Sequence, residues 1–136
     1  MLPSGMPKGL PEYPCAALTE KVIGAFYAVY HELGYGHVEA LYRRAMAVEL
    51  RYRHLDVRQE VPFEMIYRGA SIGLYRADLV VDSRLIVEAK AGHLLDPTSK
   101  AQVLTYLKAS RLEVGLILHF GPTPSVKRIV LSRATP

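Results

Sequence analysis

The sequence predicts an α+β or mixed α/β sandwich, in which helices pack on a central sheet. Apolar residues recur at helical spacing in three segments, and short β-type runs occupy five others. Turn-forming residues separate these segments, so the expected order is two helices, three strands, one helix and two strands. Half of the 136 residues are hydrophobic and 22% are charged, which suits one domain with a real core.

Proline and glycine dominate the start of the chain. The first 16 residues contain four prolines and two glycines, a composition that disfavours both helix and sheet. We therefore expect a Pro/Gly-rich arm at residues 1–16 and a single domain at residues 17–136. A flexible terminus and a strap that docks on a partner subunit both fit such an arm.

Three helices are expected from the apolar spacing. The first covers about residues 18–33, where Thr19 is placed to cap the start and glycines end the pattern. The second covers about residues 38–54, and the third runs from Asp96-Pro97-Thr98 to about residue 110. The second helix is expected to have one apolar side, made of Leu41, Ala45, Val48 and Tyr52.

Five strands are expected, near residues 57–67, 73–81, 85–91, 113–120 and 127–131. The second and third strands are nearly continuous apolar runs, so they should be central and covered on both faces. Asp82-Ser83-Arg84 lies between them. If these residues form a three-residue turn, Val81 pairs with Leu85.

Three ionisable residues interrupt these two apolar strands. Asp78 lies in the second strand, and Glu88 and Lys90 share one face of the third because side chains alternate along a strand. A three-residue turn brings Asp78 opposite Glu88, whereas a two-residue turn puts the two carboxylates on opposite faces. Like charges directly opposed destabilise a sheet, and a bound divalent cation removes that penalty.

The same residues suit a metal site that cuts phosphodiesters. Asp78, Glu88 and the backbone carbonyl of Ala89 supply oxygen ligands of the kind that Mg²⁺ or Mn²⁺ takes. Lys90 is then placed to orient a water molecule or to stabilise negative charge on the phosphate. A buried ion pair without chemistry explains these residues equally well, so both interpretations stay open at this point.

Further polar residues are expected near this group. Gln102 and Tyr106 are four residues apart on the third helix and share a face. Gln102 would hold the attacking water or a phosphate, and Tyr106 would contact the nucleic-acid backbone. Glu39 opens the second helix and would reach the metal as an extra acid. The alternatives are a polar helix edge for the first two and a carboxylate favoured at a helix N-terminus for Glu39.

The segment from Gly36 to Tyr42 resembles the name motif of the GxxExxY family, a branch of the PD-(D/E)XK nuclease-like superfamily. Three further segments match motifs of that family in order and spacing: Tyr75–Val81, Ile86–Lys90 and Gln102–Leu107. The resemblance covers about residues 18–130. It implies a restriction-endonuclease-like αβββαβ core with a mixed central sheet flanked by helices.

The resemblance also implies metal-dependent hydrolysis of phosphodiesters. Asp78 and Glu88 match the metal ligands of the superfamily, and Lys90 matches its catalytic cation. The remaining matches are Glu39, to the acid of the first core helix, and Gln102 and Tyr106, to the motif of the helix after the central strands.

Composition and charge bear on partners and location. The net charge of +4 is compatible with a polyanionic partner, and the single cysteine excludes an internal disulfide. We see no signal-peptide pattern and no apolar run long enough for a bilayer, so we expect a cytoplasmic protein without a membrane partner. A chain of this size leaves little room for a separate recognition domain, so we expect a homodimer or a partner protein.

Together these observations favour a nuclease that uses Mg²⁺ or Mn²⁺, with DNA favoured over RNA. The alternative is a catalytically weak or inactive module of the same fold that binds nucleic acid or a protein partner.

Overall fold

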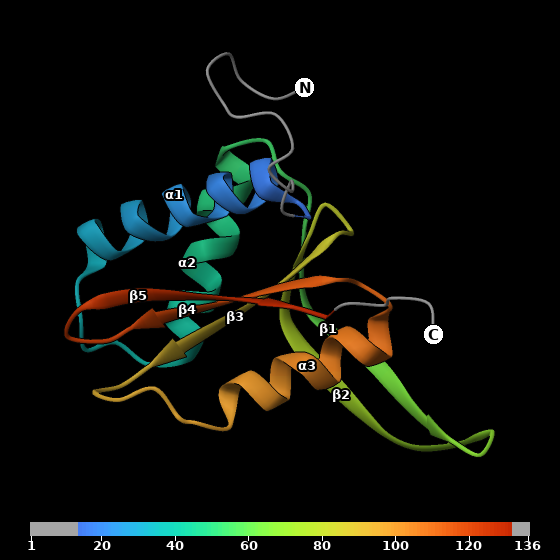
Figure 1. Cartoon of the computed structure of the whole chain (residues 1–136). Coiled ribbons are helices and arrows are strands. Elements are labelled where there is room, and N and C mark those ends of the chain that lie inside the picture. Colours follow the sequence, from blue (N-terminus) through green and yellow to red (C-terminus); the bar gives the residue numbers. More distant parts are fainter. Residues whose placement is uncertain (1–13, 132–136) are drawn as a thin grey trace, which may run out of the picture.

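Figure 1 shows the computed structural model, which describes residues 14–131. Its elements are α1 (Ala16–Leu33), α2 (Glu39–Tyr52), β1 (Val57–Tyr67), β2 (Ala70–Val81), β3 (Leu85–Ala91), α3 (Ser99–Ser110), β4 (Val114–Phe120) and β5 (Pro124–Val130). This order is the predicted one. Most of the arm predicted for residues 1–16 lies outside the described residues, and Ala16 already belongs to α1.

The five strands form one mixed sheet in the order β1-β2-β3-β4-β5. β3 and β4 run parallel, and the other neighbours are antiparallel. A parallel pair needs a crossover connection, which α3 provides between β3 and β4. The predicted class, a mixed central sheet flanked by helices, is therefore confirmed.

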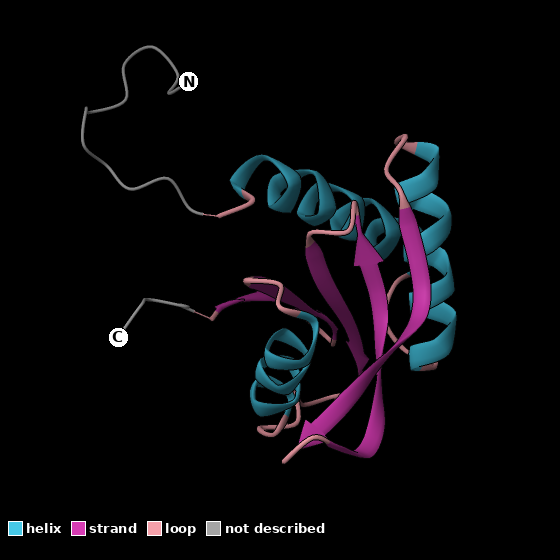
Figure 2. Ribbon diagram, turned by 90° about the vertical axis from the view of Figure 1, so that its right-hand side faces the viewer, coloured by secondary structure: helices cyan, strands magenta, loops and turns pink. Residues whose placement is uncertain are grey.

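Helices cover both faces of this sheet (Figure 2). α1 and α2 pack on one face, where Phe26 and Met46 meet Leu79 and Leu116 in the larger core. α3 packs on the other face, where Val103 and its neighbours form a second core with Val80, Ile86 and Ile117. β3 lies between the two cores and five of its seven residues are buried, as its apolar sequence predicted.

Two predictions about helices α1 and α2 are wrong. α1 begins at Ala16 with Cys15 before it, so Thr19 is buried inside the helix and does not cap it. In α2 the buried side contains Tyr42, Met46 and Leu50, whereas the predicted apolar residues Leu41, Val48 and Tyr52 are exposed. α2 carries two apolar stripes, and the stripe at i, i+4 and i+8 that starts at Tyr42 faces the sheet. Spacing alone could not choose between the stripes.

The hairpin of β1 and β2 also differs from expectation. β2 begins at Ala70, three residues early, so the turn contains only Arg68 and Gly69. Only the last part of β2 is covered, because its residues before Ala77 are exposed and the hairpin extends past α3 (Figure 1). β4 and β5 begin at Val114 and Pro124 rather than at residues 113 and 127. None of the helices within residues 14–131 has the length and apolarity needed to span a membrane.

The packing of α3 depends on a glycine in β4. A Cβ added at Gly115 would lie 2.4 Å from Cγ1 of Val103, and a valine in a helix has little freedom at χ1. We expect Gly115→Ala to lower the free energy of unfolding by about 1–3 kcal/mol, measured by urea titration. Gly73→Ala is the matched control, because a Cβ there meets nothing within 4 Å. Equal stabilities of the two variants would contradict this account of the α3 contact.

Candidate active site

The turn between β2 and β3 sets the position of the two central carboxylates. Val81 pairs with Leu85, and Leu79 pairs with Val87, so Asp82-Ser83-Arg84 is the three-residue turn that the functional interpretation requires. The backbone ladder ends at Leu79, and the next position places Asp78 beside Glu88. The Glu88 side chain lies on the face of the sheet that α3 covers, because it alternates with Val87 and Ala89 of the larger core.

The side chains of Asp78 and Glu88 each accept a hydrogen bond from the backbone of the other's strand, so that the two bonds form a crossed pair. The backbone N–H of Asp78 donates to Oε2 of Glu88 at 2.6 Å, and the backbone N–H of Ala89 donates to Oδ2 of Asp78 at 2.9 Å. Beyond Leu79 these two carboxylate bonds therefore connect β2 and β3 in place of backbone-to-backbone hydrogen bonds. Ala89 itself is fully buried between Glu88 and Lys90.

Burial makes this carboxylate pair hard to ionise. Glu88 is 1% exposed, and its burial together with the charge of Asp78 raises its pKa to about 8. Burial also raises the pKa of Asp78, although the Ala89 N–H and the charge of Lys90 oppose the shift. Without a cation, the pair therefore retains a proton at neutral pH.

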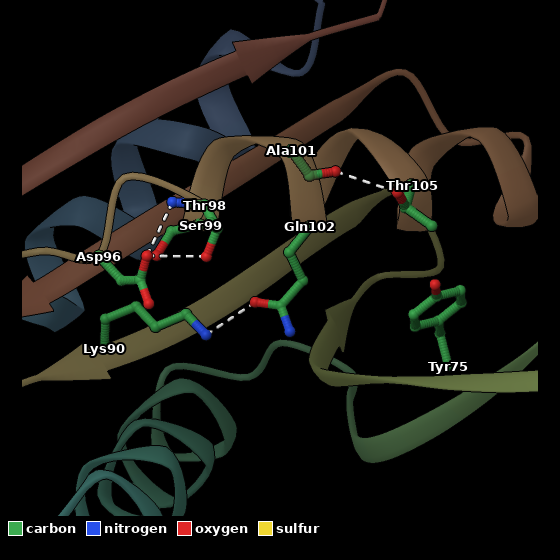
Figure 3. A pocket seen from close by; sticks show the side chains of 8 residues that line it. All are labelled: Tyr75, Lys90, Asp96, Thr98, Ser99, Ala101, Gln102 and Thr105. Atoms are coloured by element: carbon green, nitrogen blue, oxygen red, sulfur yellow. Dashed lines mark hydrogen bonds between the residues drawn. The ribbon is translucent and has the colours of Figure 1, made fainter.

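Lys90 lies at the end of β3, on the same face as Glu88. Its Nζ donates to Oε1 of Gln102 at 2.8 Å and lies 3.9 Å from Oε1 of Glu39 (Figure 3 shows the bond to Gln102). The structure therefore brings together residues from three elements, α2, β3 and α3, around one ammonium group. Gln102 lies on α3, and its hydrogen bond holds the Lys90 ammonium group in one direction.

Glu39 is more exposed than the two central acids, although its charge still acts on them. Its side chain is 48% exposed at the start of α2, and partial burial raises its pKa while Lys90 lowers it. Across residues 14–131, no group of three or more His, Cys, Asp or Glu side chains is arranged to hold a metal ion. In this structure Glu39 is thus a partner of Lys90, and Asp78 and Glu88 form a site of two carboxylates.

Tyr106 lies beneath the site rather than on its surface. It is 3% exposed, and its ring meets the ring of Tyr75 edge-on at 5.8 Å between centroids. Burial and the nearby charges of Glu88 and Asp78 raise the pKa of Tyr106, so its hydroxyl stays protonated at neutral pH. Its predicted contact with a nucleic-acid backbone stays a prediction.

Two residues near the site are not among the predicted site residues. Arg43 follows Glu39 by one helical turn, its side chain is 15% exposed, and its charge lowers the pKa values of Asp78 and Glu39. The i, i+4 spacing from Glu39 was a signal that could have found it. Tyr75 lines a groove beside Lys90, and nothing in its strand pattern indicated this, because the distal half of β2 is exposed on both faces.

Tyr42 has a structural position in the motif that begins at Gly36. Its hydroxyl donates to the carbonyl of Gly34 at 2.5 Å and accepts the backbone N–H of His37 at 3.2 Å. Its ring stacks on Phe120 with 4.0 Å between centroids. Tyr42 therefore anchors the loop that leads into Glu39 on the core of the domain.

Comparison with known proteins places this geometry in a family. A model of the PD-(D/E)XK nuclease superfamily matches residues 16–129. Among solved structures, the crystal structure of SSO0001 is similar to this chain over 85% of its residues, with a TM-score of 0.52 and 20% sequence identity. The chain spans 58% of the length of that protein, and the likeness concerns the fold alone. No curated protein sequence matches the chain.

The family match extends from the first helix to the last strand, and the mixed sheet with helices on both faces agrees with it. The fold is therefore the restriction-endonuclease-like one that the sequence predicted, and this chain belongs to the PD-(D/E)XK nuclease superfamily.

Proposed function

We propose that this domain hydrolyses phosphodiester bonds of nucleic acid with Mg²⁺ or Mn²⁺, and that DNA is its preferred substrate. The observation that carries the proposal is the crossed pair of carboxylates, half-buried Asp78 and buried Glu88, beside a lysine that Gln102 holds in place. Membership of a nuclease superfamily supports it, as does the net charge of +4, which favours a polyanion.

The donor set fits a hard divalent cation. Asp78 and Glu88 each give one oxygen to a backbone N–H, which leaves Oδ1 and Oε1 for a metal among the contacts of the described residues. Two desolvated carboxylates that repel each other are stabilised by a cation, and Mg²⁺ and Mn²⁺ prefer such oxygen ligands. The Ala89 carbonyl would add a ligand, and Glu39 would complete the set after a movement of its exposed side chain.

The other side chains have roles around the phosphate. A bound divalent cation would supply Lewis-acid activation of the phosphate. Lys90 would orient the attacking water and offset negative charge on the phosphate oxygens, because its ammonium is directed by Gln102. The Gln102 side chain also hydrogen-bonds Tyr106, and the second N–H of its amide would bind the water or a phosphate oxygen. Tyr106 would support this arrangement from below through its contact with Tyr75.

The motif around Glu39 supports a finer assignment, to the GxxExxY branch of the superfamily. Tyr42 anchors the loop before α2, and Glu39 at the start of that helix reaches to 3.9 Å from Lys90. In this proposal Glu39 acts in the site itself, and Tyr42 holds the loop that positions Glu39. We further propose residues 17–136 as the single domain that carries this site, in a homodimer or with a partner protein.

The direct test is incubation of the protein with matched DNA and RNA oligonucleotides in Mg²⁺ or Mn²⁺. We expect cleavage products with DNA, less with RNA, and none when EDTA removes the metal. Light scattering on the same sample measures the oligomeric state. Products that persist in EDTA would exclude the proposed chemistry.

One observation favours a second candidate function, a module that binds nucleic acid without hydrolysing it. Glu39 lies 3.9 Å from Lys90, and within residues 14–131 no three acids are arranged to hold a metal ion. Such a module would show salt-dependent DNA binding that survives Asp78→Asn and no turnover in any metal. Loss of binding together with loss of the acid would instead favour the nuclease.

A further inference from the structure

An open groove of about 390 Å³ lies beside Lys90 and extends along α3. Figure 3 shows Lys90 and Tyr75 on opposite sides of Gln102, beneath the first turns of that helix. The volume of the groove is within the range of small-ligand sites, roughly 300–1,000 Å³. It is therefore suited to one nucleotide of a strand whose phosphate reaches Lys90.

Tyr75 forms the far wall of this groove. It is 43% exposed, yet its ring is held by the edge-on contact with Tyr106, with 69° between the ring planes. Tyr106 is itself buried, so the supporting ring belongs to the core around α3. An aromatic ring that is held by packing and partly open to solvent loses little conformational entropy when a flat ligand stacks on it.

The near end of the groove determines where a phosphate can lie. Asp96 lines it there, and its carboxylate is held by the N–H and the hydroxyl of Thr98. Because this carboxylate repels a phosphate, the favourable place is between Lys90 and the amide of Gln102. A nucleotide in the groove would then have its phosphate at Lys90 and its base directed towards Tyr75.

We propose that this groove is a base-stacking subsite, in which an unpaired base next to the scissile phosphate stacks on the Tyr75 ring. The inference rests on the proposed nuclease function and names its substrate class: strands with unpaired bases, such as single strands and overhangs. A base inside a duplex has its faces covered by its neighbours and cannot stack on a side chain. Tyr75 is thus a binding residue that selects unpaired substrate.

The test uses fluorescence anisotropy of a labelled single-stranded oligonucleotide and of its duplex, with the full chain in Ca²⁺ to limit cleavage. Tyr75→Leu is expected to weaken single-strand binding by about 5-fold to 150-fold, the range for loss of one stacked base. Duplex binding should change less than twofold. Tyr75→Phe should bind as the original protein does, because it keeps the ring.

Tyr67→Leu is the matched control, since Tyr67 is another exposed tyrosine of the same hairpin, 62% exposed, and does not line the groove. It should change neither affinity by more than twofold. A direct readout of stacking is the fluorescence of 2-aminopurine in the oligonucleotide, in a chain that has no tryptophan. Binding should quench it with the original protein and much less with Tyr75→Leu.

The outcomes separate this inference from the function on which it rests. If Tyr75→Leu leaves single-strand binding intact, or weakens single strand and duplex equally, the subsite is wrong while metal-dependent cleavage still stands. If the original protein binds neither oligonucleotide and cleaves none in Mn²⁺, the proposed function fails and the subsite fails with it. A melting curve for each variant shows that the domain is folded.

Discussion

Replacing Lys90 with alanine is expected to reduce Mn²⁺-dependent cleavage of DNA by about 100-fold or more, the loss typical when a group that stabilises transition-state charge is removed. Lys90 is the ammonium group that Gln102 directs, at 2.8 Å, beside the two carboxylates. Its removal leaves the phosphate charge without this cation and the attacking water without this donor. The measurement is the single-turnover rate at saturating enzyme, which separates the chemical step from binding.

Lys127→Ala is the matched control for charge, because Lys127 is an exposed lysine on β5, the strand at the far edge of the sheet from β1. It should retain the original single-turnover rate. Lys90→Ala should still fold, since the Lys90 side chain is 18% exposed and the loss of its hydrogen bond costs about 1 kcal/mol. Unchanged cleavage by a folded Lys90→Ala protein would assign the activity to another centre or to a contaminant.

The metal-free protein is expected to lose stability as the pH rises from about 5 to about 8. The pKa of Glu88 is about 8 in the folded protein and about 4.5 in the unfolded chain. Between these values the unfolded chain has released the proton that the folded protein still holds, so rising pH favours unfolding. The effect should be on the order of a few kcal/mol, measured by urea titration at several pH values.

Glu88→Gln should remove most of this pH dependence, because the amide carries no charge and can still accept the Asp78 N–H. At pH 8 we expect the variant to melt several degrees above the original protein in EDTA. Glu20→Gln is the control, since Glu20 is exposed on α1, and it should keep the original profile. Stability of the original protein that is flat or rising over this range would contradict the assignment of a protonated Glu88.

The same variant tests the metal ligands. Mn²⁺ requires the ionised carboxylates, so it should raise the melting temperature of the original protein more at pH 8 than at pH 5.5. Glu88→Gln should lose this increase at both pH values. A Mn²⁺-dependent increase that survives the substitution would place the metal away from Asp78 and Glu88.

The arrangement of β2 and β3 depends largely on features that are local in the sequence. The length of the turn between Val81 and Leu85 determines the register of β2 and β3 and so brings Asp78 beside Glu88, and side-chain alternation places Glu88 and Lys90 on one face. Both rules act over a few residues, so they could be applied without knowing the rest of the chain. The position of Gln102 beside Lys90 depends in addition on the parallel pairing of β3 with β4, which α3 connects.

Other features depended on contacts between distant segments. α2 has two apolar stripes. The stripe with Tyr42, Met46 and Leu50 packs on the sheet, because it fills the space beside Phe120. Glu39 could be placed at the start of a helix from its sequence, but its distance from the acids depends on how α2 sits against β3.

The residues alone indicated the order of the elements and an acid in each of the two central strands, with a lysine two residues after the second acid, because periodicity acts locally along the chain. Two lengths of the turn between these strands were compatible with the sequence, and the paired strands show which one is present. Only the packed molecule determined which side of α2 is buried, where Arg43 lies, and that Tyr75 and Tyr106 meet beside the groove at Lys90. These depend on the space left between elements that are far apart in sequence, and no local pattern encodes that space.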